Sequence, residues 1–191
     1  PKVGLNTFYT EFSLPKELYG RWYEHEWSLK APAPLTEVEV TAYHHETVRE
    51  IKRRGLLYHA VGHGWTGTAL GLTDYQSNDA TFRLEGERKK YLAQINGERK
   101  QKAGFKHTDL CYGNPDVRRM MVRAVADYAG EHPEVDLLHV WTADGMNNDC
   151  ECELCRNTRP SDFYVMMLNA MDRELTRRGI KTRLVFLAYG D

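Results

Sequence analysis

The sequence predicts an α/β fold built from parallel βα units, and three observations support this prediction. Four apolar segments lack the strict alternation of half-exposed strands, as expected for parallel strands covered on both faces: residues 3–12, 56–61, 135–143 and 182–189. Helix signals lie between these segments. Two helix-to-strand junctions share a cationic last turn followed by a glycine, at residues 49–55 and 173–179. Strands and helices therefore alternate along the chain, which favours parallel pairing.

The expected helices have recognisable ends. Their predicted boundaries are Thr36 to Arg54, Asn114 to about Tyr128, and Ser161 to Gly179. Thr36 and Glu39 form a capping-box pattern, and Gly55 suits the position after the last turn. Pro115 suits the first position of the second helix, which we expect Gly130 to close.

Four βα units amount to half of a (β/α)₈ barrel, which takes about 250 residues. We therefore predict a single, partial TIM-barrel-like catalytic domain over residues 1–191, with a small open α/β sheet as the alternative. A long βα connection spans residues 65–113, whereas such loops usually have about 2–6 residues. Long loops at the carboxyl ends of parallel strands commonly form lids or walls of binding sites.

Composition excludes several classes of partner. The 191 residues carry a formal net charge of -1, which argues against nucleic acid, because phosphate binding usually requires a basic excess. No run of about 18 apolar residues is present, so we expect no membrane span. No signal-peptide pattern opens the sequence, which begins at Pro1 without a methionine, and we expect a cytoplasmic location. Nothing in the composition indicates an oligomeric state.

Candidate site residues follow the expected strands, at the edge where parallel α/β folds place their active sites. In chain order they are Glu11, His63, Trp65, Trp141, Asp144, Asn147 and Asp191. Neither GxGxxG nor GxxxxGK[ST] occurs, which argues against a nucleotide site. Carboxylates combined with aromatic rings suit carbohydrate chemistry: an acid protonates the leaving oxygen, and ring faces pack on the sugar.

Asp144 is the leading candidate for the acid, because partial burial at the end of an apolar strand would raise its pKa. The simpler interpretation is that Asp144 and Gly145 form a turn. For Glu11 and Asp191 the simpler interpretation, a single acid near a segment end, is the stronger one. His63 lies between two glycines, where the backbone can turn and expose both this ring and that of Trp65.

Four cysteines form a second candidate site: Cys111, Cys150, Cys152 and Cys155. They could supply the four ligands of a tetrahedral zinc site, although the paired CxxC spacing of zinc ribbons is absent. Disulfides or reduced thiols are the alternatives. Four thiolates leave no open coordination position, so a zinc ion bound here would be structural, and we expect no catalytic cofactor. In each case the cysteines would join two neighbouring loops.

Several stretches resemble one bacterial family of unknown function: LNTFYTEF, RRGLLYHAVGHGW, YLAQINGERK, LCYGNPDVRRMM, HVWTADGMNNDCECELC, RPSDFY and VFLAYGD. That family is grouped with TIM-barrel carbohydrate-active enzymes, near the β-hexosaminidases and α-glucuronidases. The resemblance covers nearly the whole chain, and the acid-then-cysteine motif at 144–155 is its most specific part. It implies a (β/α)₈ barrel and glycoside hydrolysis.

In the related hexosaminidases, the general acid is the second member of an Asp-Glu pair after the fourth barrel strand. This sequence has Ala143-Asp144-Gly145 at the similar place, so a single acid replaces the pair. The resemblance therefore carries over Asp144 as the acid, but neither the substrate-assisted mechanism nor specificity for N-acetylhexosamines.

The leading hypothesis from the sequence is a glycoside hydrolase that acts on a carbohydrate by carboxylate acid/base catalysis. Asp144 would be the acid/base residue, with His63, Trp65 and Trp141 lining the sugar site. A non-catalytic carbohydrate-binding protein and a zinc-stabilised interaction module are the alternatives.

Overall fold

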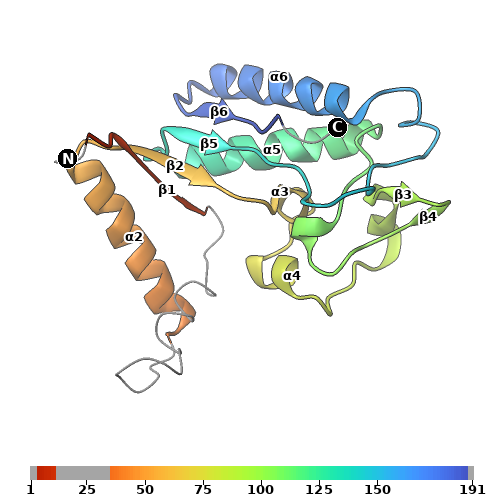
Figure 1. Cartoon of the computed structure of the whole chain (residues 1–191), viewed down its shortest axis with the longest axis horizontal. Helices are drawn as coiled ribbons and strands as arrows, with labels where there is room; N and C mark the ends of the chain where they lie inside the picture. Colours follow the sequence, from red (N-terminus) through yellow and green to blue (C-terminus); the bar gives the residue numbers. More distant parts are fainter. Residues whose placement is uncertain (1–3, 12–34, 189–191) are drawn as a thin grey trace.

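The computed structural model describes residues 4–11 and 35–188, and its centre is a parallel sheet (Figure 1). The sheet has four strands in the order β1-β2-β5-β6: β1 Thr7–Glu11, β2 Leu57–Val61, β5 Leu137–His139 and β6 Arg183–Val185. Three long helices accompany it: α2 Glu37–Arg53, α5 Pro115–Glu131 and α6 Pro160–Arg178. The predicted α/β class and the parallel pairing are confirmed.

Strand order follows chain order, which determines where the helices lie. Because βα crossovers are right-handed, parallel strands added always in one direction place their connecting helices on the same face. Tyr58, Ala60 and Leu138 point into this helical layer and are at most 1% exposed. Their neighbours His59 and Leu137, which point to the second face, are only partly buried. The sheet is thus singly wound, without the reversal of order that marks doubly wound folds.

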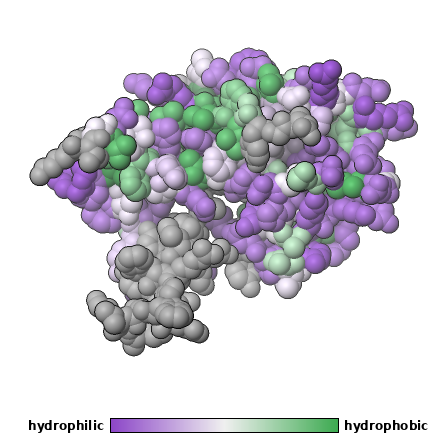
Figure 2. All heavy atoms as spheres, viewed as in Figure 1, coloured by the Kyte–Doolittle hydropathy of each residue, from purple (hydrophilic) through white to green (hydrophobic). Residues whose placement is uncertain are grey.

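Apolar side chains gather on the surface over the four-stranded sheet, as Figure 2 shows. Leu57 and Tyr9 contribute to the second face of the sheet and are 37% and 70% exposed. Within residues 4–11 and 35–188, no helix is both long enough and apolar enough to cross a membrane.

The first predicted helix has the ends expected from its sequence. The Thr36 side chain accepts a hydrogen bond from the Glu39 amide at 3.3 Å, and the Glu39 carboxylate accepts one from the Thr36 amide at 2.8 Å. After Arg54, Gly55 has φ 67°, a left-handed conformation that glycine adopts without strain. The capping box and the glycine stop are both confirmed.

The other two helices differ slightly from prediction. Asn114 caps α5 as expected, by accepting from the Asp116 amide at 2.9 Å. However, α5 does not close at Gly130; it continues to Glu131, because Gly130 keeps a helical backbone. Helix α6 begins at Pro160, one residue before the predicted cap at Ser161, since proline fits a first helical position.

The connection over residues 65–113 is folded. It contains α3 Trp65–Ala69, α4 Asp74–Asn78, η1 Gly86–Tyr91, β3 Gln94–Ile95, β4 Glu98–Arg99 and η2 Phe105–His107. The short strands β3 and β4 pair antiparallel around Asn96 and Gly97, whose φ values of 52° and 81° suit a primed hairpin turn. Phe105 and Leu110 are fully buried and attach this segment to the core. We refer to residues 65–113 as the insertion.

Asp136 connects three strands and one helix. Its carboxylate accepts from the Tyr58 amide at 2.7 Å and from Lys52 Nζ of α2 at 2.5 Å. Its amide donates to the Tyr58 carbonyl oxygen, and its carbonyl oxygen accepts from the Arg183 amide, both at 3.0 Å. Burial alone would raise the pKa of Asp136, but the Lys52 ammonium and the Tyr58 amide together lower it.

We predict that Asp136→Asn lowers the free energy of unfolding by about 1 kcal/mol at pH 7. A carboxylate whose pKa is lowered by folding stabilises the protein above its unfolded pKa of about 4, and this contribution disappears as pH falls through the folded pKa. Urea unfolding at pH 7 and pH 3 should therefore show a smaller difference at pH 3 than at pH 7. Asp172→Asn, an exposed acid on α6, is the control. A difference of equal size at both pH values would contradict the role of the ionised carboxylate.

Candidate functional site

His63 lies just beyond the carboxyl end of β2, in a turn that its neighbours make available. Gly62 and Gly64 have φ values of 133° and 128°, which side-chain-bearing residues rarely adopt. The turn brings His63 Nδ1 within 2.7 Å of the Thr142 carbonyl oxygen, beyond the end of β5. A carbonyl oxygen only accepts, so Nδ1 carries the proton, and Nε2 of the neutral ring is an acceptor.

Trp141 is the aromatic partner of His63. The two ring centroids are 5.1 Å apart, and a second histidine, His139, lies edge-on to Trp141 at 5.7 Å. Trp141 is half-buried, and its Nε1 is a buried donor with no hydrogen-bond partner in the part of the chain that the structure describes. The predicted His63–Trp141 proximity at the strand ends is present in the structure.

Trp65, unlike His63, is completely buried. The sequence predicts that Trp65 is exposed beside His63, but the residue is 0% exposed and begins helix α3. Its Nε1 donates to the His139 carbonyl oxygen at 2.9 Å, and its ring packs edge-on against Tyr128 of α5 at 5.5 Å. Trp65 is therefore a core residue that positions the end of β5, and it offers no ring face to a ligand.

Asp144 follows β5 and is held through its backbone. Its amide donates to the Lys106 carbonyl oxygen at 2.7 Å, and its carbonyl oxygen accepts from His107 Nδ1 at 2.6 Å. Both partners belong to the insertion, in or beside η2. The residue is exposed, so the partial burial expected from the sequence is not found. The strand ends before Asp144, and the chain leaves the core before reaching it.

The remaining predicted site residues occupy different surroundings. Glu11 ends β1, is exposed, and pairs in register with Val61 at the carboxyl edge of the sheet. Asn147 is exposed with φ 52°, a turn conformation that asparagine tolerates. Its neighbour Asn148 is buried and donates to the His107 carbonyl oxygen at 3.3 Å. Asp191 lies outside the described residues.

A pair of histidines that was not predicted from the sequence lies on the second face of the sheet. His59 Nδ1 lies 3.0 Å from His139 Nε2, so one ring donates to the other. Burial lowers the pKa of His139, and the nearby His59 lowers it further. The only signal in the sequence is that each histidine lies within an apolar strand, and that pattern does not reveal the register that brings the two together.

Asp109 is a second group that the sequence did not single out. It is buried in the insertion, and its Oδ1 has no hydrogen-bond partner among residues 4–11 and 35–188. Burial raises the pKa of Asp109 to about 7, although the nearby Tyr112 hydroxyl opposes the shift. Residues 106–111 read KHTDLC, and a single acid in this context gives no sequence pattern that would predict its burial.

The four cysteines come together, as expected for residues in two neighbouring loops. Their Sγ atoms all lie within 4.8 Å of one another, and none forms a disulfide. Three of the side chains are buried and Cys150 is half-buried. These thiols could hold a metal ion such as zinc.

The thiols also influence one another's ionisation. A hydrogen bond with Cys150 lowers the pKa of Cys111, whereas the same contact and burial raise that of Cys150 to about 12. Burial raises the pKa of Cys155 to about 12 as well. A cation entering the cluster would therefore displace protons from the thiols.

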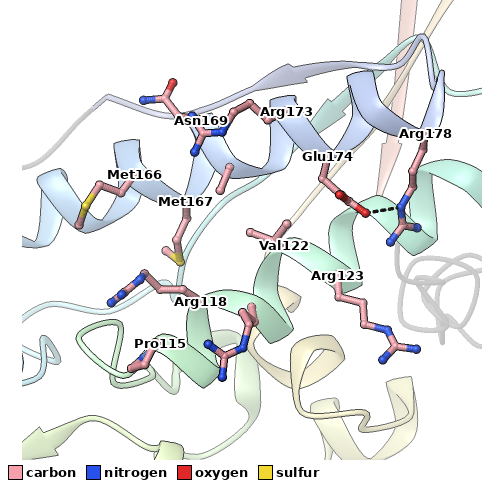
Figure 3. Close-up of a pocket in the computed structure, with 12 residues that line it drawn as sticks. Pro115, Arg118, Val122, Arg123, Met166, Met167, Asn169, Arg173, Glu174 and Arg178 are labelled. Carbon is pink, nitrogen blue, oxygen red and sulfur yellow. Dashed lines mark hydrogen bonds and ion pairs between the residues drawn. The ribbon is translucent and has the colours of Figure 1, made fainter.

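Another cavity lies away from the strand ends. It is a groove of about 760 Å³ between α5 and α6 (Figure 3). Its lining combines apolar side chains with five arginines, Arg118, Arg119, Arg123, Arg173 and Arg178. Glu174 lies in the same groove and pairs with Arg178 at 2.7 Å. Beside His63, by contrast, a small cavity of about 10 Å³ has room for about one water molecule.

We predict that Trp65→Phe lowers the free energy of unfolding by about 2–4 kcal/mol, because it leaves a void and an unpaired His139 carbonyl oxygen. Trp141→Phe is the matched control. It removes a half-buried indole that makes no hydrogen bond in the described chain, so we expect a loss below about 1 kcal/mol. Denaturant unfolding of both variants measures the difference. Equal losses would contradict the assignment of Trp65 to the core.

A scan against protein-family models and searches of curated proteins and solved structures return no match for this chain. The chemistry that the site can perform therefore follows from its own residues: an exposed carboxylate after β5, a histidine–tryptophan pair at the strand ends, and four clustered thiols.

Proposed function

We propose that this chain is part of a (β/α)₈-type glycoside hydrolase that acts on a carbohydrate, with Asp144 as the acid/base residue. The strand order β1-β2-β5-β6 supports the barrel, because a singly wound parallel sheet with its helices on one face is the arrangement from which such barrels are built. Four strands would form about half of one. The second face of the sheet, with His59 and His139, would then face the barrel axis.

The observation that carries the proposed reaction is the His63–Trp141 pair at the strand ends, with Asp144 three residues after Trp141. A tryptophan ring packs on the apolar C–H face of a pyranose. His63 Nε2, left as an acceptor by the bond from Nδ1 to Thr142, would accept a hydrogen bond from a sugar hydroxyl. These contacts would orient a sugar whose glycosidic oxygen meets Asp144.

Asp144 would protonate the leaving-group oxygen as the glycosidic bond breaks. Hydrogen bonds to Lys106 and His107 fix the backbone of Asp144. The position from which its exposed side chain extends is therefore defined. A bound sugar would cover the carboxylate and exclude water from it. Glycoside hydrolysis requires a second carboxyl group. Glu11, at the same edge of the sheet, is the first residue to test for that role.

We predict that Asp144→Asn lowers the rate of hydrolysis of an unactivated glycoside by about 10²–10⁴-fold, as expected for loss of a general acid. The measurement is kcat/KM of the purified protein on natural disaccharides and oligosaccharides. Glu153→Gln is the matched control, because Glu153 is an exposed acid in the same loop. We expect it to keep full activity.

Aryl glycosides with good leaving groups extend this experiment. Such substrates need little protonation, so Asp144→Asn should lose much less activity on them than on unactivated glycosides. An equal loss on both substrate classes would show that Asp144 has a structural role. Full activity of the variant on unactivated glycosides would overturn the proposed function.

We predict that Trp141→Ala weakens carbohydrate binding about tenfold or more, whereas Asp144→Asn leaves it nearly unchanged, because ring stacking contributes mainly to affinity. Isothermal titration calorimetry with the best substrate or its unreactive analogue measures both. Binding without any turnover by the unmodified protein would instead favour a non-catalytic carbohydrate-binding protein.

A further inference from the structure

Two sulfur–sulfur distances within the cysteine cluster are close to those of a tetrahedral metal centre. Cys111 Sγ lies 3.4 Å from Cys152 Sγ and 3.7 Å from Cys155 Sγ. A disulfide would require about 2.0 Å. Zinc–sulfur bonds of about 2.3 Å in a tetrahedron place the sulfur atoms about 3.8 Å apart. These two distances are thus close to the tetrahedral value, and all four sulfur atoms lie within 4.8 Å of one another, so a movement of about 1 Å or less in each remaining distance would close the site.

We propose that Cys111, Cys150, Cys152 and Cys155 bind one zinc ion as a closed tetrathiolate centre, with Arg99 as its charge-balancing residue. Arg99 was not anticipated from the sequence. The centre would bind zinc whatever reaction occurs at Asp144, so the two proposals can fail independently.

Hydrogen-bond donors surround the sulfur atoms. The Gln94 amide donates to Cys150 Sγ at 3.3 Å, and the Gly113 amide donates to Cys155 Sγ at 3.2 Å. Such donors stabilise thiolates and orient them toward a metal. They come from β3 and from the turn before α5, so the surroundings of the sulfur atoms are built from separate segments of the chain.

Arg99 provides the positive charge that a net negative zinc–tetrathiolate centre needs. Its Nη1 lies 3.6 Å from Cys150 Sγ and also donates to the Leu92 carbonyl oxygen at 2.6 Å. The second bond holds the guanidinium in place beside the sulfur. Its neighbour Lys100 extends elsewhere and pairs with Glu98 at 3.5 Å.

Gly113 indicates how tightly the segments fit around the sulfur atoms. A Cβ atom at this position would lie 2.8 Å from Cys155 Sγ and would also collide with the Leu154 backbone. The turn before α5 can therefore approach the cysteine loop only because residue 113 has no side chain. This close approach places Cys111 beside Cys152 and Cys155.

The centre would fasten the loop after β5 to the insertion. Besides the sulfur contacts, the Glu151 amide donates to the Gln94 carbonyl oxygen at 2.8 Å, and the Glu151 carboxylate accepts from the Asn96 amide at 2.7 Å. The loop thus lies against the β3–β4 hairpin, and zinc would join both to the start of α5. A closed set of four thiolates leaves no position for substrate, so the role is structural.

The first test is metal analysis of the full chain, purified under reducing conditions from cells grown with both zinc and iron. We expect about one zinc per chain, and four thiols that react with a thiol reagent only after denaturation and chelation. Replacement of zinc by cobalt should give the intense visible bands of tetrahedral tetrathiolate cobalt. Iron in place of zinc, disulfides detected by mass, or a metal-free protein with four reactive thiols would each overturn the proposal.

Variants test the residues. Cys152→Ser should bind much less than one zinc ion per chain. If this variant does not fold, Arg99→Met still tests the proposed zinc centre. Arg99→Met should retain zinc but lose it to a competing chelator at about 10–100-fold lower chelator concentration, as for other residues that contact metal ligands. Lys100→Met is the matched control, with zinc retention unchanged. Equal zinc retention in the two variants and the unmodified protein would exclude the role of Arg99.

Discussion

The rest of the structure depends on the hydrogen bonds and the ion pair that Asp136 makes. Through its backbone and side chain together, Asp136 contacts β2, β6 and α2 at the point where β5 begins. A one-residue slip of β5 would exchange the faces of the sheet on which His139 and Leu138 lie. It would break the fit of Leu138 into the core and remove His139 from His59. The register at Asp136 therefore determines what reaches the carboxyl edge of the sheet.

Most of the helix ends, though not the expected stop at Gly130 or the expected cap at Ser161, could be predicted because their signals are local. Thr36, Asn114 and Gly179 act on backbone groups within a few residues, and all three behave as their types suggest. The parallel sheet could be predicted from its apolar strands. The burial of Trp65 could not be predicted, because a glycine-flanked turn is equally compatible with an exposed ring and with the start of a short helix. Its burial involves contacts with Tyr128 and His139, which are far away in the sequence.

In the candidate site, too, local features could be predicted from the sequence and long-range contacts could not. The spacing of three cysteines within six residues predicts that they share a site, but nothing in that spacing identifies Arg99 or Gln94, which reach the thiols from a hairpin of two-residue strands. Such strands are too short to show periodicity. Likewise Asp144 was predicted as an acid from its place after a strand, whereas its exposure depends on how the loop leaves the core, and residue types do not determine this.

The apolar second face of the sheet bears on how the sequence can vary. Side chains such as Leu57 and Leu137 lie outside the buried cluster shared by the helices, so replacing them would cost that cluster little. Tyr58 and Leu138, one residue away along the same strands, have no such freedom. Alternate positions of one strand are thus under different constraints, because one set packs against the helices and the other set does not. If natural variants keep apolar residues at positions 57 and 137, this would indicate that another protein segment packs against this face. It would not reflect the packing of the helices on the other face.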